Sequence, residues 1–274
     1  KLIIKEKKEA YLNGIKQISP RKFLGEFQAV VFSPSVLSVI RDGPSEKRKF
    51  LDIAISLIRP NYAALLSKYN KTVIQRNKLL KDIDYNTSLK ETLPMWNEQL
   101  LKYGTELIIM RSEFIKELNP LIAEIHAGLS GGKETLSIAY EPNVSPENFR
   151  EQLAKNQFQE IRQRQTLTGP HRDDLNFIVN GTDIRRFGSQ GQQRTAALSL
   201  KLAEIELVKK IVKDYPVLLL DDVLSELDSN RQNYLLQSIH NIQTVITCTG
   251  LDELIENNFS IDRVFRVTEG KIDF

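Results

Sequence analysis

The sequence is poor in cysteine, with Cys248 alone among 274 residues. A single thiol can neither close an internal disulfide nor supply a thiolate cluster for a metal, so a reducing compartment fits best and we expect a cytoplasmic protein. No run approaches the ~18 consecutive apolar residues that cross a bilayer. Residues 1–10 also lack the apolar centre of a signal peptide. These absences argue against a disulfide scaffold, a membrane partner and export.

The composition is that of a globular chain, with 41% hydrophobic and 27% charged residues. At roughly 150 residues per domain, the length predicts one large domain or two closely joined lobes. The 38 Lys and Arg against 35 Asp and Glu give a net charge of +3, which is too small to indicate nucleic acid by itself. The distribution of charge along the chain is therefore more informative than its sum.

Residues 41–125 have a helical pattern. Pro60 separates a predicted helix over residues 46–58 from a second over residues 62–83. After a polar turn at 84–90, apolar residues recur at alternating spacings of three and four, the repeat of one helical seam. Two such helices joined by a short turn predict an antiparallel hairpin, a coiled-coil-like arm; the alternative is two amphipathic helices packed on a core. The seam consists of Leu93, Trp96, Leu100, Tyr103, Leu107, Met110 and Phe114.

Strand patterns occupy both ends of the sequence. The dipeptides Asn13-Gly14 and Asn180-Gly181 are hairpin-turn signals, the first within a predicted hairpin over residues 1–18 that has a polar segment at 6–9. In the last third, helices alternate with apolar strands, which predicts a mostly parallel sheet covered on both faces. The fold class is therefore α/β with a helical insertion. Strands are predicted at 28–32, 135–140, 174–180, 182–187, 217–220, 244–248 and 263–267, and helices at 196–214 and 230–242.

Two acids, Asp221 and Asp222, follow the apolar strand at 217–220. Ligands of open α/β sheets bind at the carboxyl ends of strands, and two carboxylates there suit a hydrated Mg²⁺ and a base for water. The alternative is that such an acid only caps a following helix. Asp228 has the same alternative, because a predicted helix begins near Asn230.

The segment from Phe187 to Arg194, FGSQGQQR, leads directly into a predicted helix. Small residues let backbone N–H groups approach an anion at a helix N-terminus, and the planar cation of Arg194 adds to that attraction. The pattern favours a phosphate site. The alternative is a loop that needs glycine only for positive φ.

The order of these segments resembles that of ABC-type ATPases. Ser189 to Gln192 resembles their signature motif, VLLLDD at 217–222 resembles their Walker B strand, and Ser225 to Asp228 resembles their D-loop. Each motif is weak alone, but a glycine-serine-glutamine segment, a helix and then an apolar strand ending in paired acids is a much more specific combination.

Four segments narrow the resemblance to one branch. RDGPSEKRKFLD at 41–52, QRN at 75–77, GPHRDD at 169–174 and SQGQQRT at 189–195 are similar to the RecF family of bacterial recombination mediators, relatives of the Rad50 and SMC heads. The resemblance implies an ABC-ATPase-like, Rad50-head-like sheet with a helical insertion lobe that contains a short antiparallel helical hairpin.

The resemblance also implies roles for individual residues. Asp221 would bind Mg²⁺ through water. Asp222 stands where ABC enzymes usually place a catalytic glutamate, and the shorter side chain is consistent with slow turnover. Thr247, with Thr249 nearby, ends the next strand, where transporters carry a switch histidine. The residues expected to contact ATP or line the dimer seam are Ser189, Gly191, Gln192, Arg194, Asp228 and Thr247.

The function that the resemblance implies is an ATP-driven homodimer with weak ATPase activity that binds double-stranded or gapped DNA with little sequence specificity. It would act with RecR, and with RecO, to load recombinase in DNA repair, replication and recombination. Three alternatives stay open: a Rad50- or SMC-type DNA-tethering head, a DNA scaffold with a vestigial nucleotide site, and a metal-dependent nuclease that uses Asp221, Asp222 and Asp228. A nuclease would have no need for the SQGQQR segment.

A Walker A loop is not evident in the sequence. Residues 128–135, GLSGGKET, approach G-x-x-x-x-G-K-[ST], but Glu134 replaces the hydroxyl and the glycine spacing is wrong. Since RecF-like chains carry this loop on their first strand, the resemblance predicts that a segment precedes Lys1. Without the loop, these residues alone are expected neither to bind ATP nor to hydrolyse it. The expected division is ATPase-lobe strands at 1–40, a helical lobe at 41–130 and a C-terminal ATPase lobe at 131–274.

Positive charge is concentrated in the helical lobe. Residues 41–90 hold eleven Lys or Arg against five acids, an excess of six. Such a patch favours phosphate binding through counterion release, and the alternative is a solvated helix surface. His171 and Arg172 could touch nucleotide, DNA or the neighbouring acids at 173–174. The candidate DNA-binding residues are Arg41, Lys47, Arg48, Lys49 and Arg76.

Overall fold

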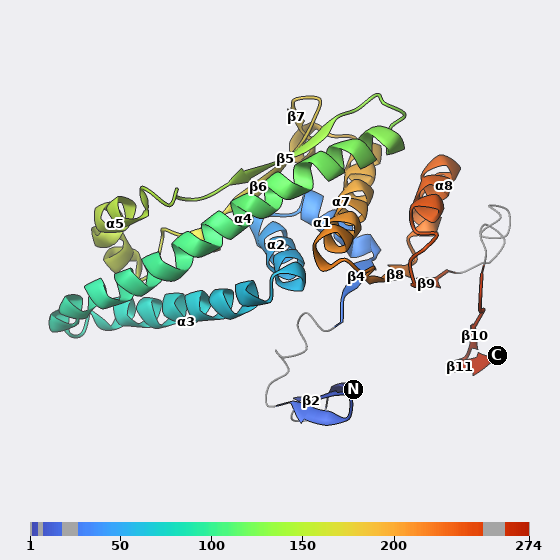
Figure 1. Cartoon of the computed structure of the whole chain (residues 1–274). Coiled ribbons are helices and arrows are strands. Elements are labelled where there is room, and N and C mark those ends of the chain that lie inside the picture. The colour runs from blue at the N-terminus through green and yellow to red at the C-terminus, as the bar shows by residue number, and fades with distance from the viewer. Residues whose placement is uncertain (1, 5–7, 18–26, 249–260, 274) are drawn as a thin grey trace.

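The computed structural model describes residues 2–4, 8–17, 27–248 and 261–273 (Figure 1). No helix within those residues is long and apolar enough to cross a membrane. A long helical arm extends from a body in which helices pack on two small sheets, and two further antiparallel sheets lie near the chain ends. The α/β class with a helical insertion is therefore confirmed. Thr249 lies outside the described residues.

One sheet is parallel and joins segments far apart in the sequence. Its strand order is β4, β8, β9, with Val30 opposite Leu218 and Leu218 opposite Thr244. Because parallel neighbours need crossover connections, β4 and β8 are joined by a long one, which takes up residues 33–216. Its strands are β4 (Ala29–Phe32), β8 (Val217–Asp221) and β9 (Thr244–Thr247).

Among the described residues, helices cover only one face of the parallel sheet. Val30, Phe32, Leu218 and Leu220 are buried against α7 (Gln190–Val212) and α8 (Ser229–Ser238). On the other face Val31 is 48% exposed and Val245 is 54% exposed. The prediction of cover on both faces is wrong for the described chain. The prediction of a mostly parallel sheet is confirmed, since β8 pairs in parallel with both β4 and β9. The other described sheets are antiparallel.

The second sheet of the body has the order β5 (Leu136–Glu141), β6 (Asp174–Val179), β7 (Thr182–Asp183). The predicted Asn180-Gly181 turn is confirmed, with φ of 49° and 81°. The strand predicted over 182–187 is wrong beyond Asp183. There the Asp183 side chain accepts from Arg185 N and caps α6 (Ile184–Phe187).

The arm consists of two antiparallel helices, α3 (Pro60–Asp82) and α4 (Leu93–Leu129), joined by a 3-10 turn at Thr87–Thr92 (Figure 1). At 1.5 Å per residue the 37 residues of α4 span roughly 55 Å. The predicted seam is buried at every seventh residue, at Leu93, Leu100, Leu107 and Phe114. The predicted helical hairpin is therefore confirmed.

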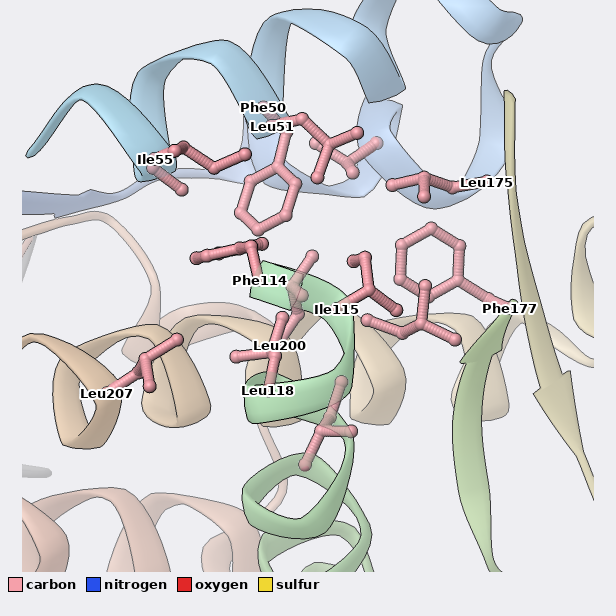
Figure 2. Packing of buried hydrophobic residues seen from close by; sticks show 14 of the residues in the cluster. Phe50, Leu51, Ile55, Phe114, Ile115, Leu118, Leu175, Phe177, Leu200 and Leu207 are labelled. Atoms are coloured by element: carbon pink, nitrogen blue, oxygen red, sulfur yellow. The ribbon is translucent and has the colours of Figure 1, made fainter. Parts of the chain in front are cut away.

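A single core connects the base of the arm to the body. Figure 2 shows side chains from four elements meeting there, and each is buried. Residues 41–130 and 131–274 therefore share one core. The elements are α2 (Pro44–Ile58) with Phe50, Leu51 and Ile55, α4 with Phe114, Ile115 and Leu118, β6 with Leu175 and Phe177, and α7 with Leu200 and Leu207.

The remaining elements refine or extend the predictions. Asn13-Gly14 forms its predicted turn, but Glu9 lies within a strand and not in a polar turn. Helix α5 (Phe149–Gln163) has no counterpart among the predicted elements. The last predicted strand is replaced by a hairpin of two strands. The elements not yet given are β1 (Leu2–Ile4), β2 (Lys8–Leu12), β3 (Ile15–Gln17), α1 (Leu37–Arg41), β10 (Arg266–Thr268), β11 (Lys271–Asp273) and 3-10 turns at Pro34–Val36, Pro170–Arg172 and Leu224–Glu226.

Candidate functional site

The signature-like segment forms the start of helix α7. Ser189 is the N-cap: its Oγ accepts a hydrogen bond from Gln192 N (3.1 Å), and Gln192 Oε1 accepts one from Ser189 N (2.9 Å). This capping box stabilises the first turn of the helix, although glycine there is unfavourable. Because of this capping box, the helix starts at Gln190. The sequence pattern predicts a later start, near Ala196. Ser189 and Gly191 are exposed at this helix start.

The two glycines of this segment have different surroundings. A Cβ on Gly188 would lie 2.6 Å from Ile184 O, so the fold itself requires glycine there. A Cβ on Gly191 would approach only Ser189 Oγ, at 3.8 Å, which is ordinary contact. Glycine inside a helix costs up to about 1 kcal/mol relative to alanine. The described residues therefore give no packing reason for glycine at position 191.

The next residues of α7 connect the segment to α1. The exposed Arg194 lies on the first turns of the helix, whereas the buried Gln193 donates from Nε2 to Ile184 O (2.8 Å). Gln193 Oε1 accepts from Arg41 Nε (2.8 Å), so the candidate DNA residue Arg41 is held beside the signature-like segment. Sequence reasoning did not place these two segments together.

The paired acids lie at the carboxyl end of β8, as predicted. Thr247 Oγ1 donates to Asp221 Oδ1 (2.7 Å), and Asp222 N donates to Thr247 Oγ1 (3.1 Å). Asp222 has a φ of 52°, and its Oδ1 accepts from Ser225 Oγ (3.0 Å). Both carboxylates are exposed, and neither caps a helix. The predicted residues 221, 222 and 247 thus form one polar cluster at a strand end.

Asp228, in contrast, caps α8. Its Oδ1 accepts from Arg231 N (3.0 Å), and its carboxylate also pairs with the Arg231 guanidinium. The backbone N–H of Arg231 lowers the pKa of Asp228, and the guanidinium charge acts in the same direction. This is the helix-cap alternative that the sequence left open. Within the described chain, no cluster of three or more His, Cys, Asp or Glu is arranged to hold a metal ion.

A shallow hollow brings the start of α7 close to the segment after β8. Arg194 and Ala197 of α7 line it together with Val223 and Leu227, which follow β8. Phe32, at the carboxyl end of β4, contributes to the same hollow. The first turns of α7 and the D-loop-like segment therefore lie close together, near the carboxyl end of β4.

The GPHRDD segment is engaged inside the protein. Tyr69 OH and His171 Nδ1 are 2.6 Å apart, and His171 Nε2 lies 3.1 Å from Thr166 O. Since a carbonyl only accepts, Nε2 carries the hydrogen and Nδ1 accepts from the tyrosine. Burial lowers the pKa of His171 to about 4, so the ring is neutral near pH 7. Arg172 donates to Thr166 O as well. The described contacts of both residues are with protein groups.

Two of the candidate DNA-binding residues are buried. Lys47 Nζ donates to Leu175 O (2.5 Å) and lies 3.2 Å from an Asp174 oxygen. The Arg76 guanidinium pairs with Glu160 (2.6 Å), and neither side chain is exposed. The expectation that Lys47 and Arg76 contact DNA is therefore wrong in this structure. The helical periodicity indicates that Arg76 is buried, because Arg76 shares one helix face with Tyr69, Thr72 and Leu80, which are all buried.

The other basic candidates reach the surface to different degrees. Lys49 and Arg41 are exposed, whereas Arg48 is half-buried and donates to Asp173 O (2.8 Å). Sequence reasoning missed a further residue, Glu134, in the GLSGGKET segment. That segment leads into strand β5 and not into a helix, and Glu134 Oε1 accepts from Gln192 Nε2 (2.8 Å). Glu134 is therefore in direct contact with the signature-like segment, through Gln192.

No family model matches the sequence. The DNA replication and repair protein RecF of Agathobacter rectalis is 51% identical over 269 residues, which cover 95% of this chain and 74% of that protein. The protein of the same name from Acetivibrio thermocellus is 43% identical over 277 residues, covering 97% of this chain and 75% of that protein. A solved structure of the recombination mediator protein RecF-ATPrS in the RecFOR pathway has a TM-score of 0.89 at 36% identity. It covers 97% of this chain and 73% of that chain.

The sequence similarity extends over nearly all of this chain, and the match to a solved RecF structure covers 97% of it. The fold class predicted from the motifs is therefore confirmed by a relative whose fold was solved. These findings show that the chain belongs to the RecF family of DNA replication and repair proteins.

Proposed function

We propose that this chain provides the dimer-forming signature and the acidic strand end of an ATP-dependent DNA-binding recombination mediator. In this role ATP drives two copies together on double-stranded or gapped DNA, and the dimer works with RecR and RecO to load recombinase. The names of its relatives support the repair role, and solved RecF structures are described with ATP and ATPrS. Residues 41–130 would serve as the DNA-facing lobe and residues 131–274 as the ATPase lobe.

The observation that carries the proposal is the first turn of α7. Ser189, Gly191 and Gln192 lie at a helix start, where backbone N–H groups and the helix dipole favour an anion. Gly191 has space for a side chain that nothing in the described protein fills. A phosphate that approaches the backbone closely explains glycine there. In this proposal the anion is the γ-phosphate of ATP held by a second copy, and Arg194 adds positive charge.

The acidic strand end would supply the metal and the base. Mg²⁺ prefers carboxylate oxygens and retains several waters, and the exposed Asp221 with its Thr247 hydroxyl neighbour fits such a hydrated ion. When bound, Mg²⁺ neutralises the developing phosphate charge. Asp222 would orient the attacking water. Its shorter side chain, compared with the usual glutamate, is consistent with slow hydrolysis.

DNA binding would use exposed cations on the outer face of the arm. Lys71, Lys78 and Lys81 of α3 are exposed and lie seven and three residues apart, so they share one helical face. Arg41 and Lys49 are exposed nearer the body. Point charges of this kind recognise phosphates and carry no base sequence information. The proposed binding is therefore electrostatic and largely independent of sequence.

Ser189→Asp in the intact protein tests the role of the signature. Aspartate is as good an N-cap as serine, so α7 should remain stable, but its charge repels a phosphate at the helix start. ATP-induced dimers measured by sedimentation should be lost, while binding of ATP to the monomer is retained. Asn86→Asp is a matched control, because it adds one negative charge at the exposed N-cap of the arm-tip turn. Normal dimerisation of the Ser189→Asp protein would contradict the proposal and favour a scaffold without a working nucleotide site.

A further inference from the structure

The turn after the arm helix brings a carboxylate back to the signature. Helix α4 ends at Leu129, and Gly131 and Gly132 follow with φ of 62° and 75°. Gly132 N donates to Ala127 O (2.8 Å), which folds the chain back against the end of the helix. Glu134 N then donates to Ser130 Oγ (3.2 Å). The position of Glu134 is therefore fixed by the backbone of this turn.

The Glu134 carboxylate bridges two helices. Its Oε1 accepts from Gln192 Nε2 (2.8 Å) in the first turn of α7, and its Oε2 lies 3.3 Å from His126 Nε2 near the end of α4. The His126 side chain is fully buried, and the Glu134 side chain is 22% exposed. Hydrogen bonds to ionised groups are stronger than neutral ones when partly shielded from water. The bridge is therefore a restraint on both of its partners.

His126 anchors this carboxylate to the core. Because a carboxylate only accepts, His126 Nε2 carries a hydrogen toward Glu134, and Nδ1 faces Ser199 Oγ of α7 at 2.9 Å. Burial lowers the pKa of His126, although the Glu134 charge opposes the shift. The end of the arm helix therefore contacts α7 directly at Ser199 and through Glu134 at Gln192.

The Gln192 amide is held at both of its ends. Its oxygen accepts from Ser189 N (2.9 Å), and its nitrogen donates to Glu134. A free amide can rotate to present either atom to the N-cap, but only the oxygen can accept from Ser189 N. An acceptor-only group at position 134 holds the amide nitrogen away from the N-cap. It thereby selects the orientation that the capping box requires.

We propose that Glu134 is a positioning residue for the signature. Its carboxylate holds the Gln192 side chain, and with it the Ser189 N-cap, in the orientation that receives the phosphate of the opposing nucleotide. This inference rests on the proposed ATP-dependent dimer. It adds a residue from outside the recognised motifs, and one whose side chain acts through Gln192 and does not touch ATP.

Glu134→Ala in the intact protein tests this role. The protein concentration needed for half-maximal ATP-induced dimerisation should rise about tenfold, with unchanged affinity of the monomer for ATP. Glu134→Gln should restore dimerisation to within about twofold, because its amide oxygen accepts from Gln192 and its nitrogen donates to the other tautomer of His126. Glu141→Ala is the matched control: it removes an exposed carboxylate of β5 that accepts from a side-chain amide, Asn176 Nδ2 (2.6 Å), on the adjacent strand β6.

A double-mutant cycle separates positioning from a general structural effect. If Glu134 acts through Gln192, then Glu134→Ala should change dimerisation little in a Gln192→Ala background. Additive losses, or a Glu134→Ala protein that dimerises normally, would overturn the inference and leave the proposed function intact. A wild-type protein that stays monomeric with ATP would overturn both. Should the alanine variant fail to fold, Glu134→Asp keeps the charge but shortens its reach and is expected to lose dimerisation in the same way.

Discussion

Two Asp-Asp pairs in this molecule lie at strand ends and have opposite surroundings. Asp173 immediately precedes β6 and is fully buried. Its Oδ2 accepts from Arg111 Nη1 (2.7 Å) and Tyr140 OH (2.5 Å), and its Oδ1 accepts from Asn143 N (2.9 Å). Both oxygens are therefore satisfied by protein groups, and the arginine connects them to the base of the arm.

Asp221 and Asp222 lie at the carboxyl end of β8 and are exposed. Their described partners are small hydroxyl or backbone groups, at Thr247 and Ser225, with no cation among them. An acid whose oxygens are all occupied inside the protein stabilises the fold, whereas an acid that faces water retains capacity for a ligand. The two pairs also lie at opposite ends of their strands. Asp173 and Asp174 lie at the amino end of β6, whereas Asp221 and Asp222 lie at the carboxyl end of β8, the end at which ligands of open α/β sheets bind.

Asp173→Asn should have the largest effect on stability. The substitution removes the charge that pairs with the buried Arg111 and replaces one acceptor oxygen with a donor nitrogen. Breaking a buried pair by changing one partner costs about 3–5 kcal/mol, because the other charge stays buried and uncompensated. Urea denaturation of this chain should show the loss. A change below about 1 kcal/mol would show that water reaches this network.

An exposed ion pair gives the contrast for that measurement. Arg150 of α5 pairs with Glu98 of α4, and both side chains are exposed. Arg150→Met should change the free energy of unfolding by less than about 1 kcal/mol, because solvent screens exposed pairs. Arg111→Met, the same substitution in the buried network, should cost several times more.

The second prediction concerns pH and the neutral His171. Its pKa in the folded protein is lowered to about 4 from an ordinary value of 6.5, mainly by burial, with Arg172, Arg48 and Arg76 acting in the same direction. Between those values the unfolded chain binds a proton that the folded chain does not. The contribution of His171 to the free energy of unfolding should therefore be complete above pH 6.5. It should decrease as the pH falls toward 4, by up to about 1.4 kcal/mol per pH unit.

His171→Gln isolates this contribution. Glutamine can accept from Tyr69 OH and donate to Thr166 O, but it does not titrate. Unfolding measured from pH 7.5 to 4 should have a shallower pH dependence in this variant. His126 is also buried with a lowered pKa, so part of the slope should remain. His240, which is exposed, offers a control substitution, and an equal slope in wild type and His171→Gln would contradict the assignment.

Local patterns were sufficient for the arm and for one hairpin. The seven-residue spacing of Leu93, Leu100 and Leu107 is a repeat within one helix, and Asn180-Gly181 determines a turn by its own backbone preference. Neither depends on distant contacts. The acids after β8 were predictable for the same reason, since an apolar strand and its polar end are contiguous in sequence.

Features that depend on distant partners were not predictable. Helix α5 buries Glu160, which is paired with Arg76 from a remote part of the arm, so its buried face does not appear as an apolar stripe. Lys47 is buried because Leu175 O and Asp174 accept from it, and both lie on β6. The role of Glu134 depends on Gln192, 58 residues away. Charge identity alone does not distinguish these residues from solvated ones.

The third prediction extends the contrast to cations. Alanine at Lys71, Lys78 and Lys81 should weaken binding of the intact protein to duplex or gapped DNA and reduce its salt dependence by about 0.9 log units per lost contact. Stability should change little, because all three are exposed. Alanine at three exposed lysines elsewhere, Lys133, Lys210 and Lys271, is the control for net charge. Equal effects of the two sets would refute a localised DNA surface.

The smallest change in stability is expected for Asp222→Asn, the same substitution that should be so costly at Asp173. Asparagine tolerates the left-handed conformation that Asp222 adopts, and its side-chain oxygen can still accept from Ser225 Oγ (3.0 Å). The free energy of unfolding should therefore change by less than about 0.5 kcal/mol. ATP hydrolysis by the intact protein should be lost in this variant while ATP-induced dimers persist, because an amide cannot act as a base for water. If Asp222→Asn destabilises the fold as much as Asp173→Asn does, both acid pairs are structural. The exposed end of β8 would then not be assigned a role in ATP hydrolysis.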